Sequence, residues 1–153
     1  MKVFISYSVA DIAAVRKIAE EIRPHAEPCF WEQNKSPGEE VWKTIQNWID
    51  SADCVIAVIT DKVVARGESV HHEIGYAKKA GKLVIPLVAS NVPPDRLGML
   101  ASATWIKFDP NEPSAALDGL KRKLAEVALT KQQQGFVLLL IAGITLFALS
   151  SSN

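Results

Sequence analysis

The stretch Cys54-Val55-Ile56-Ala57-Val58-Ile59-Thr60 decides the fold, because it is continuously apolar and rich in β-branched residues. Such a run is typical of a parallel strand that is covered on both faces. The sequence Ser69-Val70-His71-His72-Glu73-Ile74-Gly75-Tyr76-Ala77 comes soon after it and predicts a helix that Ser69 caps and Gly81 ends. Glu73 then falls about one turn into this helix, near the carboxyl edge of the sheet, where open α/β sheets bind ligands.

Four other apolar runs predict strands, and the segments between them have helical spacing. The strands are expected at residues 3–7, 28–31, 83–88 and 104–108, and helices at residues 12–22, 39–49 and 114–129. Trp42 and Trp48 fall on the apolar face of the second of these helices and are expected in the core. Strands that alternate with helices predict an α/β fold, in which a five-stranded parallel sheet carries helices on both faces. The expected strand order is flavodoxin-like, although the alternation does not fix the order.

The balance of charge and the placing of histidine and cysteine argue against several classes of function. The chain has 17 basic and 17 acidic residues, so no basic field favours a nucleic-acid partner. His71 and His72 are adjacent on the predicted helix and point in different directions, so they cannot chelate together and no metal site is expected. Cys29 and Cys54 lie in apolar strand-like runs and are expected to be buried thiols in a reducing compartment.

The C-terminal segment differs in composition from the rest of the chain, because every charged side chain lies at or before Lys131. The run 135–149, of about 15 residues, would span roughly 22 Å as a helix, against about 30 Å for a bilayer core. The serines that follow and local thinning of the bilayer close much of this gap. We therefore predict a globular domain at 1–130, a linker at 131–134 and a single-pass membrane tail anchor, a hydrophobic helix, at 135–152. The alternative is an apolar segment that packs in an oligomer.

Basic residues lie before this tail and none follows it, so the positive-inside rule places the globular domain in the cytoplasm.

The first 130 or so residues resemble a Toll/interleukin-1 receptor (TIR) domain, because several short segments match that family in the same order. The matching segments are Val3-Phe4-Ile5-Ser6-Tyr7-Ser8 with Asp11, Pro37-Gly38 with Trp42, Ser51-Ala52-Asp53, and Val70 with Glu73. The first is similar to the first sequence box of the family, and the second to the loop and helix after the second strand. Glu73 falls where NAD-cleaving members carry their catalytic glutamate.

The resemblance implies a prokaryotic, NAD-cleaving protein in which Glu73 is catalytic and NAD+ is the substrate rather than a cofactor. Cleavage of the bond between nicotinamide and ribose develops positive charge on the ribose, which a carboxylate can stabilise or attack. Nicotinamide is already a cationic leaving group, so a single carboxylate suffices. The plain alternative is that Glu73 is an acid at a helix start, favoured by the helix dipole.

The resemblance also implies substrate-binding residues around Glu73. Ser6-Tyr7-Ser8 end the first strand at the ligand edge and are expected to line the site; the alternative is a strand end followed by a helix cap. Catalytic members carry a tryptophan four residues before the glutamate, where this chain has Ser69. Trp31, at the end of the second strand, is expected to supply an aromatic wall instead.

The loop after the second strand is expected to mediate self-association, through Lys35, Ser36, Pro37 and Gly38. The expectation is thus a membrane-anchored TIR domain that, when its copies cluster, releases nicotinamide and linear or cyclic ADP-ribose. The resemblance implies a role in anti-phage defence, with a downstream effector that senses the cyclic product. The expected partners are NAD+, other copies of the chain and the membrane. Two alternatives stay open: a non-enzymatic adaptor that recruits other TIR domains, and a nucleoside or nucleotide glycosidase of similar fold.

Overall fold

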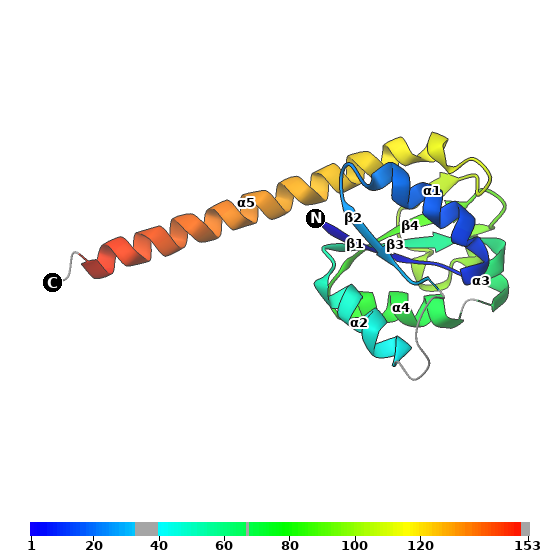
Figure 1. The fold of residues 1–153 in the computed structure, drawn as a ribbon, viewed down its shortest axis with the longest axis horizontal. Coiled ribbons are helices and arrows are strands. Elements are labelled where there is room, and N and C mark those ends of the chain that lie inside the picture. The colour runs from blue at the N-terminus through cyan, green and yellow to red at the C-terminus, as the bar shows by residue number, and fades with distance from the viewer. Residues whose placement is uncertain (33–39, 67, 151–153) are drawn as a thin grey trace.

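β3 (Cys54–Ile59) lies at the centre of a five-stranded parallel sheet whose strand order is β2-β1-β3-β4-β5 (Figure 1). The other strands are β1 (Lys2–Ser6), β2 (Glu27–Phe30), β4 (Leu83–Ala89) and β5 (Ile106–Phe108). This flavodoxin-like order confirms the predicted fold class. The structure, a computed structural model, describes residues 1–32, 40–66 and 68–150, without the side chains of 65, 66 and 136–150.

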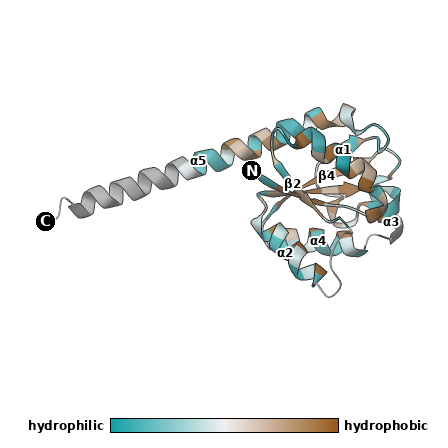
Figure 2. Ribbon diagram, in the orientation of Figure 1, coloured by the Kyte–Doolittle hydropathy of each residue, from teal (hydrophilic) through white to brown (hydrophobic). Residues whose placement is uncertain are grey.

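Helices cover both faces of the sheet (Figure 1). α1 (Ile12–Ile22) and the start of α5 (Leu117–Ser150) lie on one face, and α2 (Val41–Ser51) and α4 (Glu68–Lys79) lie on the other. α3 (Asp61–Arg66) directly follows β3. Short 3-10 helices occupy the connections: η1 (Val9–Asp11), η2 (Pro94–Arg96), η3 (Gly98–Leu100) and η4 (Pro113–Ala116). Figure 2 shows apolar strands inside and more polar outer helix surfaces.

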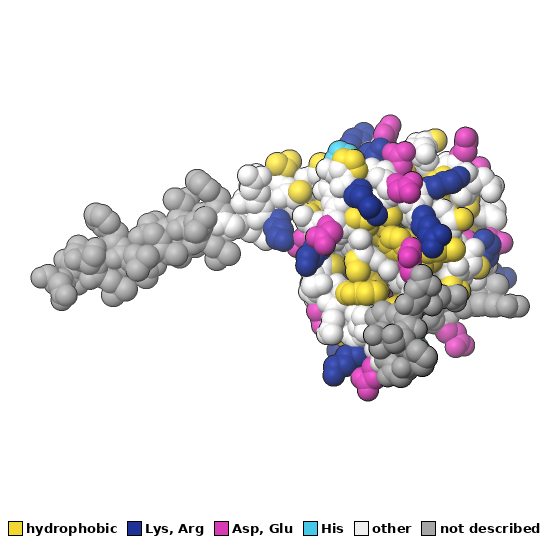
Figure 3. Space-filling view, in the orientation of Figure 1, with side chains coloured by type: hydrophobic (Ala, Val, Ile, Leu, Met, Phe, Trp, Pro, Cys, Tyr) yellow, Lys and Arg dark blue, Asp and Glu magenta, His cyan; other side chains and the backbone are white. Residues whose placement is uncertain are grey.

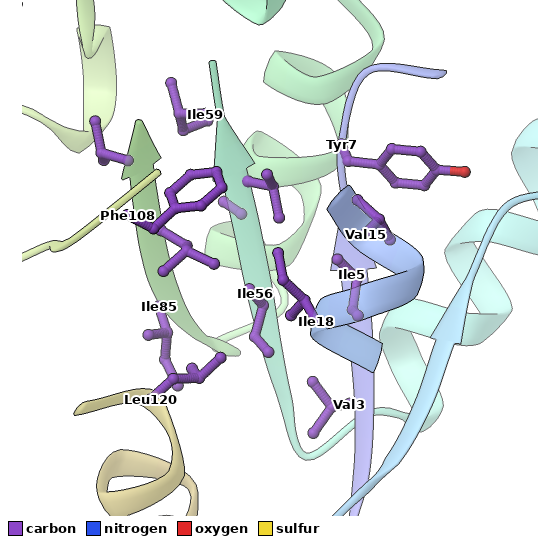
Figure 4. Close-up of a cluster of buried hydrophobic side chains, with 14 of the residues drawn as sticks. Val3, Ile5, Tyr7, Val15, Ile18, Ile56, Ile59, Ile85, Phe108 and Leu120 are labelled. Atoms are coloured by element: carbon purple, nitrogen blue, oxygen red, sulfur yellow. The ribbon is translucent and has the colours of Figure 1, made fainter. Parts of the chain in front are cut away.

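The two faces of the sheet bury separate apolar clusters, because successive strand residues point to opposite sides. On the α1 and α5 side Ile5 and Ile56 belong to a cluster that includes Ile18 and Leu120 (Figure 4). On the α2 and α4 side a second cluster is formed by Phe4, Ile45, Ile49, Ala52, Val55 and Ala77. Every residue of β3 is buried, as predicted for a strand covered on both faces.

The cysteines lie on different strands. Cys54 is a fully buried thiol, as predicted, and burial raises its pKa to about 11. Cys29 is only half-buried in β2.

Two details of the helices differ from the prediction and one agrees with it. α4 begins at Glu68, so Ser69 is its second residue and the prediction that Ser69 caps it is wrong. α3 ends at residue 66, so only residue 67 separates the two helices. Trp42 is 42% exposed and packs edge-on against Tyr76, so its expected place in the core is also wrong. Gly81 has a φ of 69° and follows the end of α4, as predicted, and the N–H of Lys82 donates back to Ala77 at 2.9 Å.

α5 is one helix of 34 residues, and residues 131–134, predicted to be a linker, are part of it. Lys131 Nζ lies 2.6 Å from Asp53 Oδ1, which ties this stretch of the helix to the start of β3. Burial would raise the pKa of Asp53, but the hydrogen bonds from Lys131 and the Lys2 N–H outweigh it and lower the pKa. The tail anchor predicted at 135–152 falls almost entirely on side chains outside the described residues. Within the part of the chain that was described, no helix is long and apolar enough to cross a bilayer.

Candidate functional site

Glu73 occupies a position on α4 that the helix otherwise fills with apolar side chains. The buried residues of α4 are Val70, Glu73, Ile74 and Ala77, the spacing of the face that an amphipathic helix turns toward a core. Glu73 is only 7% exposed. Burial of a carboxylate costs free energy unless the group is hydrogen-bonded, so a buried acid at this edge of the sheet is a candidate for chemistry.

Ser6 is the hydrogen-bond partner of Glu73. Ser6 Oγ donates to Glu73 Oε2 at 2.5 Å, and Ser6 is itself fully buried at the end of β1. Burial raises the pKa of Glu73 from 4.5 to about 7, and the hydrogen bond from Ser6 acts in the opposite direction. The second carboxylate oxygen, Oε1, has no hydrogen-bond partner among the described residues. Two residues predicted for the site therefore meet, but Ser6 contacts the catalytic candidate itself.

Tyr7 lies on the other face of the sheet, beside Val15 of α1 (Figure 4). Its hydroxyl donates to the backbone carbonyl of Trp31, directly after β2, and its ring meets Phe30 edge-on with centroids 6.2 Å apart. Burial, and then the charge of Glu32, raise the pKa of Tyr7 to about 12, so the phenol is neutral. Tyr7 therefore holds the exit of β2 through the backbone of Trp31.

Trp31 is half-buried on the same face as α4. Its ring packs against Trp48 of α2, with centroids 6.0 Å apart, and it joins the cluster that contains Phe4 and Ala77. Arg16 and the neighbouring Glu32 form an exposed ion pair at 3.2 Å. The exit of β2 is thus held by contacts on both sides, and the Trp31 ring packs on the side of the sheet that α2 and α4 cover.

A second buried carboxylate, that of Asp11, makes its hydrogen bonds apart from Glu73. Asp11, which belongs to the first segment that resembles the family, is 3% exposed and makes no capping bond at the start of α1. It accepts hydrogen bonds from Thr60 Oγ1 at 2.6 Å and Lys62 Nζ at 2.9 Å. These contacts join the start of α1 to the chain that leaves β3 toward Glu73. The signal in the sequence is Thr60, a residue with a hydroxyl that directly follows the apolar run of β3.

The remaining predicted residues are dispersed. Ser8 is half-buried; its carbonyl accepts the Asp11 N–H at 2.7 Å, and its hydroxyl makes no capping bond. Ser69 is exposed on α4, one turn before Glu73. The self-association residues Lys35, Ser36, Pro37 and Gly38 lie outside the described residues.

A cavity of about 560 Å³ lies elsewhere, between β4, β5 and α5. Leu83, Pro86 and Trp105 contribute to its mostly apolar wall, and the charged side chains there, such as Arg122, are exposed. It contains no buried acid or base, so it offers no chemistry comparable to Glu73. Among the described side chains, no three of His, Cys, Asp and Glu gather closely enough to hold a metal ion. On the face seen in Figure 3, charges of both signs are interspersed and no field of one sign forms.

Comparisons with known proteins identify the family and the fold. A family model described as "TIR domain" matches residues 3–124. No curated protein matches the sequence. The TIR domains of the activated Roq1 resistosome, which recognises the pathogen effector XopQ, are similar in structure, with a TM-score of 0.53 and 13% identity over 65% of this chain. The match spans 63% of that chain. The Clostridium botulinum CMP N-glycosidase BcmB is similar with a TM-score of 0.54 and 22% identity, over 77% of this chain and 98% of its own. At these identities the likeness concerns the fold.

Proposed function

Because this chain belongs to the TIR domain family, we propose that it cleaves the N-glycosidic bond between nicotinamide and ribose in NAD+, with Glu73 as the catalytic carboxylate. The observation that carries this proposal is a buried carboxylate on the inner face of α4, held by Ser6 at the end of β1. That edge is where open parallel sheets bind ligands. An apolar residue at this buried position would stabilise the fold better than an acid does, so the acid is better explained by function.

The chemistry follows from the charge that develops during cleavage. The bond between the ribose anomeric carbon and the nicotinamide nitrogen breaks, and its electron pair leaves with nicotinamide, which becomes neutral. The ribose gains oxocarbenium-like positive charge, which the carboxylate of Glu73 stabilises. This attraction is stronger in a buried site than in water, because the effective dielectric constant there is lower. Water then adds to the anomeric carbon and releases a proton, giving ADP-ribose; attack by a nitrogen of the adenine ring instead gives a cyclic product.

The test is nicotinamide release from NAD+ by the full-length protein, followed by chromatography. Glu73→Gln keeps the shape of the side chain and an oxygen for the Ser6 hydroxyl but removes the charge, so we expect activity to fall by about 10²–10³-fold. Glu68→Gln is the matched control, because Glu68 is an exposed acid on the same helix. Full activity in Glu73→Gln would contradict the proposal.

The second candidate function is that of a nucleotide N-glycosidase, and the raised pKa of Glu73 supports it. A pKa of about 7 leaves a large fraction of Glu73 protonated near neutrality. A neutral base such as cytosine needs a proton as it leaves, unlike nicotinamide, and a protonated carboxyl can supply it. The same assay with CMP decides between them: cytosine release without nicotinamide release selects the second candidate. Release of neither, from folded protein, favours a non-enzymatic TIR adaptor.

We further propose that clustering promotes activity and that the apolar run 135–149 anchors the protein in a membrane. The support is the sequence of this run, which carries no charge. Leu140→Arg places a charge in its middle, which costs about 2.5–3.5 kcal/mol in a bilayer, so co-flotation with phosphatidylcholine vesicles should be lost while Leu129→Arg retains it. NAD+ turnover per molecule should rise with protein density on the vesicles. The role in anti-phage defence is tested by plaque counts on cells that express the wild type or Glu73→Gln.

A further inference from the structure

Ser6 and Glu73 form a contact that the sheet holds rigidly. Ser6 ends β1, its backbone pairs with Ala57 of β3, and its side chain has no exposed surface. Glu73 sits on the buried face of α4, between Val70 and Ala77. The 2.5 Å hydrogen bond therefore joins two fully packed elements, and neither group can turn away without disturbing the core.

We propose that Ser6 is a positioning residue for the reaction: its hydroxyl fixes Oε2 of Glu73, so that Oε1 is the oxygen that meets the ribose of the substrate. The proposal rests on the proposed function for the identity of the substrate. It follows from the distribution of bonds, because Oε2 accepts the Ser6 hydroxyl while Oε1 has no partner among the described residues. A carboxylate held through one oxygen presents the other in a defined direction, which is what stabilisation of a developing charge requires.

The same hydroxyl keeps Glu73 closer to its ionised form. Burial is the larger influence on the pKa of Glu73 and raises it, while the Ser6 hydrogen bond lowers it. The titratable neighbours in the described residues are Tyr7 directly after β1, which is neutral, the exposed His72 and Glu68 on α4 itself, and Tyr76, whose hydroxyl donates to Asp50 of α2. None of these offers Glu73 a second hydrogen bond, so removal of the Ser6 hydroxyl should favour the protonated acid.

The test is the pH dependence of kcat/KM for NAD+ in Ser6→Ala. A hydrogen bond to a charged group corresponds to about one pH unit, so the lower midpoint of the profile should move up by about one unit. At pH 7 the ionised fraction, and with it kcat, should fall about fivefold, while KM changes less than twofold. Thr60→Val is the matched control, because Thr60 also donates from a buried hydroxyl to a buried carboxylate, that of Asp11. It should lower stability by a similar amount and leave the midpoint where it is.

A second measurement separates failure of this proposal from failure of the proposed function. Titration of Glu73 by NMR, with ¹³C-labelled glutamate carboxyl groups and Glu73→Gln to assign the signal, needs no turnover. The Glu73 midpoint should be higher in Ser6→Ala than in the wild type, and Ser6→Cys, which keeps the volume with a weaker donor, should fall between them. An unchanged midpoint in both Ser6 variants would overturn the proposal, whether or not the wild type cleaves NAD+. A raised midpoint with no turnover of NAD+ would refute NAD+ as the substrate, while it would support Ser6 as the residue that orients Glu73 and lowers its pKa.

Discussion

Replacing Glu73 with glutamine should make the folded protein more stable at alkaline pH, although the same change should strongly lower the proposed activity. Burial raises the pKa of Glu73 from 4.5 to about 7, so ionisation is harder in the folded than in the unfolded chain. The unfolded chain therefore loses this proton first, and the stability of the wild type falls as the pH rises from about 4.5 through about 7. Glutamine cannot ionise and escapes this loss.

The size of the effect follows from the separation of the two pKa values. Each pH unit of separation corresponds to about 1.4 kcal/mol, so a folded pKa of about 7 against 4.5 amounts to about 3 kcal/mol at full ionisation. The difference in unfolding free energy between Glu73→Gln and the wild type should therefore be near zero at pH 4 and reach about 3 kcal/mol in favour of the variant at pH 8.5. Since glutamine still accepts the Ser6 hydroxyl, no hydrogen bond is lost to confuse the comparison.

Urea unfolding of the full-length protein, followed by tryptophan fluorescence at several pH values, measures this difference. Glu68→Gln controls for the titration of every other group, because it removes an exposed acid from the same helix. A difference that does not change with pH, or a wild type that is more stable than Glu73→Gln at pH 8.5, would refute the reasoning about burial.

Three further predictions concern stability and use the same unfolding measurement. Gly81→Ala should cost about 1–2 kcal/mol, because Gly81 has a φ of 69°; no loss would mean that another residue can end α4. Leu120→Ala should cost about 2–5 kcal/mol because Leu120 is fully buried, whereas Leu129→Ala, 59% exposed on the same helix, should change stability by less than about 0.5 kcal/mol. Equal losses would contradict the packing of α5. Asp11→Ala should cost about 2–3 kcal/mol because it leaves the Thr60 hydroxyl without its acceptor; a loss below about 0.5 kcal/mol would argue against that network.

Local patterns predicted the elements of the fold well, and the misses have physical causes. β3 was recognisable because a strand buried on both faces must be apolar throughout. The prediction for Trp42 is wrong because helical spacing alone puts this residue beside the apolar face of its helix. In the structure its ring lies at the edge of the core, where it contacts Tyr76 and is partly exposed. The prediction that Ser69 caps α4 is wrong because the sequence does not reveal that α3 ends only at residue 66 and α4 begins at Glu68.

The candidate site divides in the same way. Glu73 could be singled out in sequence, because it falls about one turn into a helix after a buried strand, near the ligand edge, and where NAD-cleaving members of the family carry their glutamate. Its partner could not be identified. Ser6 is 67 residues away, and the sequence predicted that it would bind substrate with Tyr7. In the structure, the alternation of side chains along β1 sends Ser6 toward α4 and Tyr7 toward α1.

The sequence by itself therefore determined the parallel sheet, the helix that carries Glu73 and the glycine that ends it, because each depends on residues close together along the chain. Only the tertiary structure decided that β1 lies beside β3, and with it the bond from Ser6 to Glu73 and those from Thr60 and Lys62 to Asp11. These contacts depend on strand order and register, which arise when distant segments bury their apolar faces together, and no local pattern of residues records them.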